Sequence, residues 1–209
     1  MGRSGAQRLA LVETAGQAGA QQTTGAPDTG RRSDDELMLL ARAGRRGAFD
    51  QLVRRHQARA LAVAGKLVGD PDRAGDAVQN TFLQVYRRLD RYQTRGRFRS
   101  YLFAVLLSQC RMTQRRLRRE RRRRARLEEP PSQVQRPDEC VLQQEKMRIV
   151  DRALRRLSRK LRTVVVLRYA GDLSIREIGE LLELPAGTVK SRLFAGLRKL
   201  RGAIGREGG

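Results

Sequence analysis

The sequence contains no long hydrophobic run. No apolar stretch approaches the roughly 20 residues that a membrane-spanning helix requires, and the N-terminus has no apolar core of the kind found in secretory signal peptides. The sequence therefore predicts a soluble, cytoplasmic protein with no membrane insertion.

Cysteine and histidine are scarce as well. The two cysteines, Cys110 and Cys140, have no companions at metal-ligand spacing, so they are interpreted as buried or incidental thiols rather than as a disulfide or zinc site. The single histidine, His56, lies beside two arginines in a helical run and is interpreted as a surface or packing residue. No nucleophile–base pair and no phosphate-cradling glycine loop occurs. We expect neither an enzyme nor a cofactor.

Acidic residues are outnumbered two to one by basic residues. The chain has 45 Lys and Arg against 22 Asp and Glu, a formal net charge of +23, and the sequence pI is about 11.6. A surplus of this size repels itself unless a polyanion is bound. Nucleic acid is the leading candidate for that partner.

The apolar periodicity is helical almost throughout, so the predicted fold class is all-α with two small domains joined by a basic flexible linker. Residues 1–32 lack sustained periodicity and are expected to form a disordered tail, and residues 33–117 and 141–205 are expected to form the domains. Nine of the twelve residues from Arg115 to Arg126 are arginine, and prolines follow. Because such charges repel within a helix, residues 118–140 are assigned to the linker, either a solvated spacer or a contact with nucleic acid or an acidic channel.

Several helix boundaries can be predicted from capping signals. Asp70 suits an N-cap and Pro71 the first helical position. The valine-rich segment 159–170 could be a strand by β-branching alone, but its length and charged flanks favour a buried helix. Ser174 and Glu177 have the spacing of a capping box, which predicts a short helix over 174–183.

A second helix is predicted from Thr188 to about Arg201. Its apolar residues form one stripe at spacings of four, four, three and four, namely Val189, Leu193, Leu197, Leu200 and Ile204. Acidic residues occur on the first of the two helices and basic residues on the second. This pair is typical of a helix-turn-helix whose second helix enters the major groove, with an ordinary helical hairpin as the alternative.

These segments resemble a known family. LRTVVVLRYAGDLSIREIGELLELPAGTVKSRLFAGLRKLR is similar to the C-terminal DNA-binding region of bacterial sigma-70 family factors, especially their extracytoplasmic-function (ECF) group. AFDQLVRRHQARALAVAGKLVGDPDRAGDAVQNTFLQVYRRLDRY resembles the core-binding region of that family, and FRSYLFAVLLSQC resembles its promoter-melting segment. The resemblance implies a subunit that binds core RNA polymerase, directs it to promoter DNA and helps to open the duplex.

The resemblance also implies three sets of contact residues. The clamp of the largest polymerase subunit would meet Asp76, Gln79 and Asn80, with Val78 and Phe82 packed inward. The −10 strand would meet Tyr92, Arg95, Arg97, Phe98, Tyr101 and Ser108, since aromatic and arginine side chains can hold unstacked bases, with packing in the core as the alternative for Phe98. The −35 duplex would meet Arg176, Thr188, Lys190, Ser191, Arg192, Phe194 and Arg198. Anti-sigma control is common in this family, so an anti-sigma partner is an expectation by analogy.

The match has departures that keep an alternative open. Asn80 stands where an acidic residue is common, Ser108 replaces an asparagine, and Ala195 replaces an arginine. Losing an asparagine amide removes a group suited to paired hydrogen bonding with a base. The alternative is a sigma-like helix-turn-helix regulator that binds DNA without initiating transcription.

Overall fold

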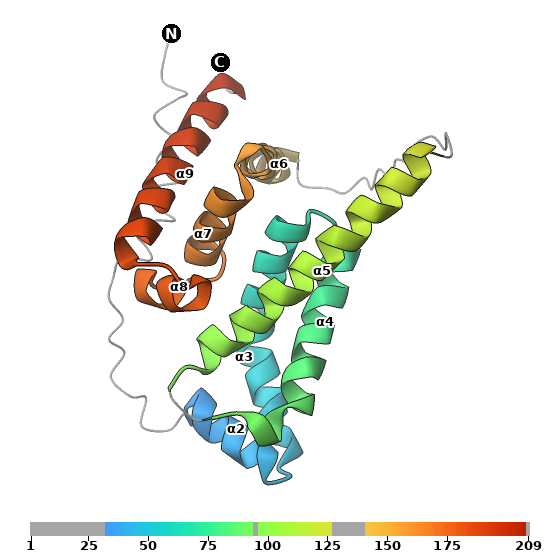
Figure 1. Cartoon of the computed structure of the whole chain (residues 1–209), viewed down its shortest axis with the longest axis vertical. Coiled ribbons are helices and arrows are strands. Elements are labelled where there is room, and N and C mark those ends of the chain that lie inside the picture. The colour runs from blue at the N-terminus through green and yellow to red at the C-terminus, as the bar shows by residue number, and fades with distance from the viewer. Residues whose placement is uncertain (1–31, 94–95, 127–140, 208–209) are drawn as a thin grey trace.

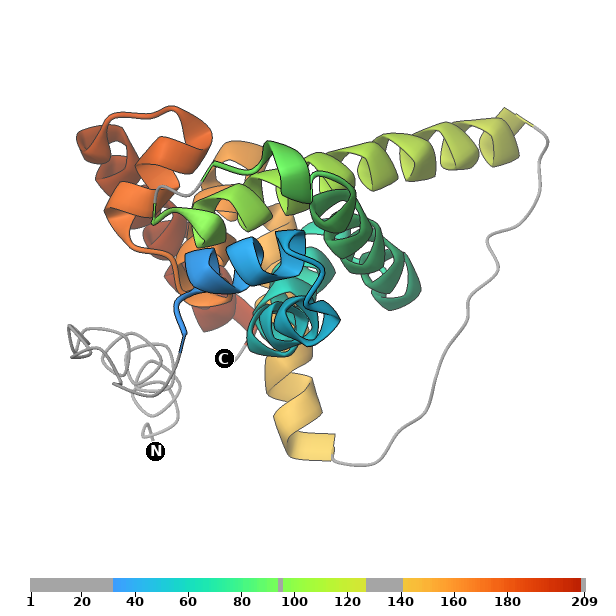
Figure 2. The same cartoon turned by 90° about the horizontal axis from the view of Figure 1, so that it is seen from below.

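The computed structural model describes residues 32–93, 96–126 and 141–207, and no strand occurs among them. The helices, in chain order, are α2 (Asp34–Arg42), α3 (Arg46–Val68), α4 (Pro71–Arg87), the short 3₁₀ helix η1 (Leu89–Arg91), α5 (Phe98–Arg126), α6 (Val141–Arg156), α7 (Arg159–Tyr169), α8 (Ile175–Leu182) and α9 (Ala186–Glu207). They form two packed groups, shown in Figures 1 and 2. The all-α prediction is confirmed. None of these helices is long and apolar enough to cross a bilayer.

The first helical unit, α2 to α5, is built around three long helices. Leu52, Val63, Val85, Phe103 and Leu106 are fully buried where α3, α4 and α5 meet. The predicted start of α4 is confirmed, because the Asp70 carboxylate accepts a hydrogen bond from the Arg73 backbone N–H at 3.0 Å and Pro71 is the first helical residue. Two large apolar residues of this unit, Leu61 and Leu83, lie outside that core and are each 45% exposed.

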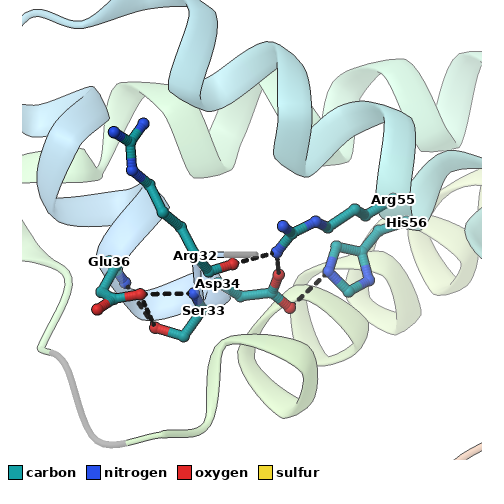
Figure 3. A network of polar contacts seen from close by, with 6 residues as sticks. All are labelled: Arg32, Ser33, Asp34, Glu36, Arg55 and His56. Atoms are coloured by element: carbon teal, nitrogen blue, oxygen red, sulfur yellow. Dashed lines mark hydrogen bonds and ion pairs between the residues drawn. The ribbon is translucent and has the colours of Figure 1, made fainter. Parts of the chain in front are cut away.

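Two sets of polar contacts fix the start of the first unit (Figure 3). Ser33 and Glu36 form a capping box at the start of α2. The Asp34 carboxylate accepts hydrogen bonds from Arg55 at 3.0 Å and from His56 at 2.7 Å, which ties α2 to α3. Burial by itself raises the pKa of Asp34, but His56 and Arg55 outweigh burial and the pKa lies below its ordinary value.

The second helical unit, α6 to α9, contains the predicted helix-turn-helix. The segment 159–170 is helical as predicted, with Val164 to Leu167 buried. Ser174 and Glu177 form the predicted capping box at the start of α8. Helix α9 begins at Ala186, two residues before the predicted start. It directly follows Pro185, whose carbonyl oxygen accepts a hydrogen bond from the Val189 backbone N–H at 3.1 Å. Gly196 lets α9 approach α7 closely, since a Cβ there would lie 2.6 Å from Cγ2 of Val165.

Helix α5 is longer than the sequence predicted. It continues to Arg126, so residues 118–126 are helical rather than part of a flexible linker. Arginine has high intrinsic helix propensity, and Glu120 relieves part of the repulsion by pairing with Arg116 at 2.9 Å and with Arg73 of α4 at 3.2 Å. The far end of α5 projects from the body of the molecule (Figures 1 and 2). Several predictions fall outside the described residues. These are the predicted tail up to residue 31, the role of Arg95, and the rest of the predicted linker, including Cys140.

The two units contact each other through polar groups beside a close backbone approach. Arg99 of α5 donates hydrogen bonds to the carbonyl oxygens of Gly171, at 2.8 Å, and of Asp172. The Asp172 carboxylate lies 3.4 Å from Arg59 and 3.6 Å from Arg99. Gly171 directly follows Ala170, the C-cap of α7, and it has to be small, because an added Cβ would lie 2.7 Å from the Leu167 carbonyl oxygen and 3.2 Å from Val63 of α3.

Two further ion pairs cross the same boundary. Lys66 of α3 lies 2.6 Å from Asp151 of α6. Arg97, just before α5, lies 3.8 Å from Glu180 of α8. In each of these four ion pairs between the units, the first unit supplies the cation and the second supplies the carboxylate.

Candidate nucleic-acid interface

An apolar groove runs between α3 and α4. It has a volume of about 460 Å³ and is lined at its base by Phe49, Val78 and Phe82. Its edges carry Leu61, Leu83 and Tyr86, which are between 45% and 47% exposed. Leaving three large apolar side chains in water is unfavourable unless another surface covers them. The groove is therefore a candidate protein-binding surface.

The three residues predicted to contact polymerase lie at this surface. Asp76, Gln79 and Asn80 are exposed on α4, and Gln79 lines the groove itself. Val78 and Phe82 are 5% and 7% exposed, so they pack inward as predicted. The geometry brings the predicted polar residues and the apolar groove onto neighbouring faces of one helix.

The loop before α5 is fixed by a carboxylate of α2. The Tyr92 hydroxyl donates a hydrogen bond to Asp35 at 2.5 Å, and the Gly96 backbone N–H donates to the other oxygen of the same carboxylate. Gly96 has a φ of +64°, which a glycine adopts without strain. Desolvation and the Asp35 carboxylate raise the pKa of Tyr92 well above its ordinary value. Asp35 therefore anchors Tyr92 and Gly96, the residue directly before Arg97.

Phe98 does not present a face on which a base could stack, contrary to its predicted role. It is 2% exposed, and its ring centroid lies 5.4 Å from that of His56 and 6.0 Å from that of Tyr92. His56 is itself 6% exposed, so it is a packing residue and not a surface residue. An aromatic ring at the first position of α5 is drawn inward because α2, α3 and α5 converge there. Phe98 positions Tyr92 rather than binding a base.

The outer face of α5 carries the other residues predicted for −10 recognition. Tyr101, Ala104, Ser108 and Met112 follow one another at helical spacing. Ala104, Ser108 and Met112 are exposed, and Tyr101 is half-buried, with its ring centroid 5.4 Å from that of Tyr92. Desolvation raises the pKa of Tyr101. Tyr92 and Tyr101 are thus the aromatic pair available to unstacked bases.

Helix α9 has one buried and one exposed side. Within the predicted apolar stripe, Val189 and Leu200 are 0% and 7% exposed, and the other three members, Leu193, Leu197 and Ile204, are partly buried. Lys190, Phe194 and Arg198 recur every four residues on the opposite side, and Phe194 is 70% exposed. A phenylalanine this exposed contributes little to the fold. Its position between two cations is suited to apolar contact with a base edge such as the thymine methyl group.

The remaining residues predicted for −35 recognition lie at the start of α9 and on α8. Ser191 is exposed and donates its hydroxyl hydrogen bond to the Thr188 carbonyl oxygen at 3.0 Å, while Arg192 is half-buried. Arg176 on α8 is exposed and pairs with Glu180 at 3.2 Å. The structure therefore distributes the predicted set over α8 and α9, with Arg192 half-buried.

Comparison with protein families decides what these units are. The family model described as "Sigma-70 region 2" matches residues 52–123, and the one described as "Sigma-70, region 4" matches residues 147–200. Together they span more than half of the chain. The chain belongs to the sigma-70 family. It is a sigma factor of the ECF group, with region 2 in the first helical unit and region 4 in the second.

Curated relatives come from several bacteria. The chain is 26% identical over 182 residues to the RNA polymerase sigma-H factor of Pseudomonas aeruginosa, which covers 78% of this chain and 90% of that protein. It is 27% identical over 183 residues to the ECF RNA polymerase sigma factor SigW of Bacillus subtilis, covering 79% and 96%. It is 27% identical over 180 residues to the ECF RNA polymerase sigma-E factor of Escherichia coli, covering 78% and 89%.

Solved structures share the fold. The structure of CnrH in complex with the cytosolic domain of CnrY matches with a TM-score of 0.65 and 25% identity, over 84% of this chain and 99% of that chain. The sigma factor RpoE of Bartonella quintana, solved with the anti-sigma factor NepR, matches with a TM-score of 0.61 and 23% identity, over 75% and 96%.

Sequence reasoning missed two kinds of residue in this sigma factor. Leu61, Leu83 and Tyr86 were overlooked at the groove because an outward leucine has the same sequence signal as an inward one. Helix α4 has more apolar residues than one buried stripe can hold. That excess is the signal that could have identified Leu83 as an exposed residue. Asp34 and Asp35 were interpreted only as helix-terminus acids, and their partners at Arg55, His56 and Tyr92 are distant in sequence.

Proposed function

We propose that this sigma factor binds core RNA polymerase through the α3–α4 groove, reads the −10 strand with the loop and outer face of α5, and reads the −35 duplex with α9. The observation that carries the proposal is the separation of surfaces. One unit presents an apolar groove beside Gln79, and the other presents Lys190, Phe194 and Arg198 on an exposed helix face. A protein-binding surface and a DNA-binding surface on one chain are what a promoter-directing subunit requires.

The polymerase contact is proposed to be mixed apolar and polar. Leu61, Leu83 and Tyr86 would be covered by the clamp of the largest subunit, while Asp76, Gln79 and Asn80 would make the surrounding polar contacts. Truncated apolar anchors at the centre of an interface typically cost 2 kcal/mol or more, on the order of a 30-fold loss of affinity. Leu83→Ala should weaken binding to core polymerase by about that factor and leave the unfolding midpoint nearly unchanged, because Leu83 is largely exposed.

The −10 contact is proposed for Tyr92, Arg95, Arg97, Tyr101 and Ser108. Stacking of a base on an aromatic side chain is worth about 1–3 kcal/mol, and Tyr92 and Tyr101 are the paired aromatics at the α5 entrance. The −35 contact is proposed for Lys190, Ser191, Phe194 and Arg198, with Arg176, Thr188 and Arg192 at its border.

In the arrangement described here, the second unit contacts part of the surface proposed for the −10 strand. Arg97 of the −10 loop lies 3.8 Å from Glu180 of α8, and Arg99 is held by the α7–α8 connection. We infer that the units separate when the sigma factor engages polymerase and promoter in the cytoplasm. By analogy with the solved complex of CnrH with the cytosolic domain of CnrY, we propose a protein partner of this kind, an anti-sigma factor, for this chain.

The deciding experiment is transcription in vitro. Purified chain would be incubated with bacterial core polymerase and a pool of random promoters, and transcript starts would be sequenced. Enriched −35 and −10 sequences are expected for the wild-type chain, with weaker enrichment at −35 for Phe194→Ala. Binding to DNA without binding to polymerase would instead favour the regulator that does not initiate transcription.

A further inference from the structure

Five guanidinium groups gather where α5 meets the second unit. Arg111 and Arg118 come from α5, Arg155 from the end of α6, and Arg159 and Arg162 from the first turn of α7. Among the described residues, none of these five side chains has a carboxylate partner. Arginine remains protonated at any physiological pH. Within the described ranges, the charge of the cluster is therefore not compensated by a carboxylate.

Arg162 lies at the centre of this cluster. Its Nε atom is buried and has no hydrogen-bond partner among the described residues. Burial, followed by the charges of Arg118, Arg155 and Arg159, lowers the pKa of Arg162. Buried donors in native proteins are almost always paired, so the position of this Nε favours a hydrogen-bond acceptor beside it. A desolvated cation surrounded by cations is the most costly case of that kind.

The cluster surrounds a small notch between the two units. Leu67 of α3 together with Leu107, Cys110, Arg111 and Gln114 of α5 form one wall, and Arg159, Arg162 and Thr163 of α7 form the other. The notch has a volume of about 20 Å³, enough for one oxygen atom but not for a whole anion. Because Arg111 and Arg159 are exposed at its rim, the rest of an anion would remain in solvent between them.

We propose that a phosphate or polyphosphate group with two or more negative charges binds in this notch, held by Arg111, Arg159 and Arg162, and thereby fastens the second unit to the first. The planar guanidinium fork matches two oxygens of a phosphoryl group. A carboxylate or chloride carries one charge and would leave most of the cluster uncompensated. A phosphoryl group that contacts both walls would link α5 to α7, in addition to the hydrogen bonds that Arg99 already forms between the units.

The test uses the full chain without polymerase, so its failure would leave the proposed sigma function untouched. Pyrophosphate would be titrated at constant ionic strength while binding is followed by calorimetry and by the unfolding midpoint. We expect pyrophosphate to raise the midpoint of the wild-type chain, since a ligand of the folded state stabilises it. Arg162→Gln should weaken pyrophosphate binding at least about tenfold, on the scale of a lost charge-assisted fork.

Arg54→Gln is the matched control. Arg54 is exposed on α3 and the variant loses the same charge far from the notch, so its pyrophosphate affinity should change less than about twofold. Without any multivalent anion, Arg162→Gln should have a higher midpoint than wild type because a repelled cation is gone. A merely structural arginine would instead lower the midpoint in both conditions, which would overturn the proposal.

Further arms distinguish the source of the phosphoryl group. Inorganic phosphate is expected to bind through Arg162 more weakly than pyrophosphate. A short non-promoter duplex should bind the Arg162→Gln and Arg54→Gln variants equally. Dependence on Arg162 for the duplex but not for pyrophosphate would overturn the proposal in favour of nucleic-acid backbone. An equal response to chloride would reduce the effect to general screening and would overturn it as well.

Discussion

The contacts of Arg99 provide the sharpest test of how the two units are held together. Its guanidinium donates to the carbonyl oxygens of Gly171 and Asp172 and lies 3.6 Å from the Asp172 carboxylate. Hydrogen bonds from a charged donor contribute about 1.5–3 kcal/mol each. The side chain is 28% exposed and its Nε has no partner among the described residues, so we expect about 2–4 kcal/mol in total. Arg99→Gln should shift the equilibrium toward separated units by about 30- to 700-fold.

The assay is small-angle X-ray scattering on the isolated chain at low salt, with limited proteolysis in parallel. Arg99→Gln should increase the radius of gyration and speed cleavage between the units. Arg59→Gln is the graded control, because Arg59 is 50% exposed and forms only a surface pair with Asp172, which is typically worth under about 1 kcal/mol. If Arg99→Gln and wild type scatter identically, or if Arg59→Gln opens the chain more, the reasoning about the carbonyl contacts is refuted.

Three further predictions test other parts of the structure. Phe194→Ala should leave the unfolding midpoint unchanged, whereas Leu200→Ala, at a site 7% exposed, should cost about 2–5 kcal/mol in denaturant titration. Gly196→Ala should destabilise the second unit by up to about 2 kcal/mol, because the clash with Val165 at 2.6 Å outweighs the gain in helix propensity; an unchanged midpoint would mean that α7 and α9 can move apart freely. The pKa of Asp34 is lowered in the folded state, so the stabilisation by its carboxylate is complete at pH values above 3.8, the ordinary pKa, and is lost as the pH falls below that value. Asp34→Asn should therefore have a lower unfolding free energy than wild type at neutral pH and the same unfolding free energy in strong acid. Urea titrations at a series of pH values would show this.

Local signals in the sequence predicted the helix starts well. An N-cap or a capping box involves residues three apart, so Asp70, Ser174 and Glu177 could be assigned from spacing alone. The valine-rich α7 was also correctly predicted as helical, because length and charged flanks outweighed β-branching. In each case the determining contacts lie within a few residues of one another.

The failures all depended on contacts distant in the sequence. Helix α5 was expected to end at about residue 117 from repulsion between arginines, but Arg73 on another helix shares Glu120 and supports the continuation. Phe98 was assigned to DNA because an aromatic residue beside arginines suits a base, and only the packing with His56 and Tyr92 reveals its burial. Periodicity likewise could not tell that Leu61 and Leu83 face outward.

The contacts between the units suggest why the first helix of the helix-turn-helix is acidic in a strongly basic protein. Glu180, Asp172 and Asp151 of the second unit each face a cation of the first unit. Two of those cations, Arg97 and Arg99, belong to the loop and helix proposed to hold the −10 strand. In the proposed promoter complex, DNA phosphates would compete with these carboxylates for Arg97 and Arg99. Because the contact between the units and the binding of DNA are both electrostatic, added salt should weaken each of them. DNA binding involves many phosphates, so it should lose more affinity than the contact between the units. Raising salt should thus favour the closed arrangement over the DNA-bound one, and Glu180→Gln should shift the balance toward DNA at every salt concentration.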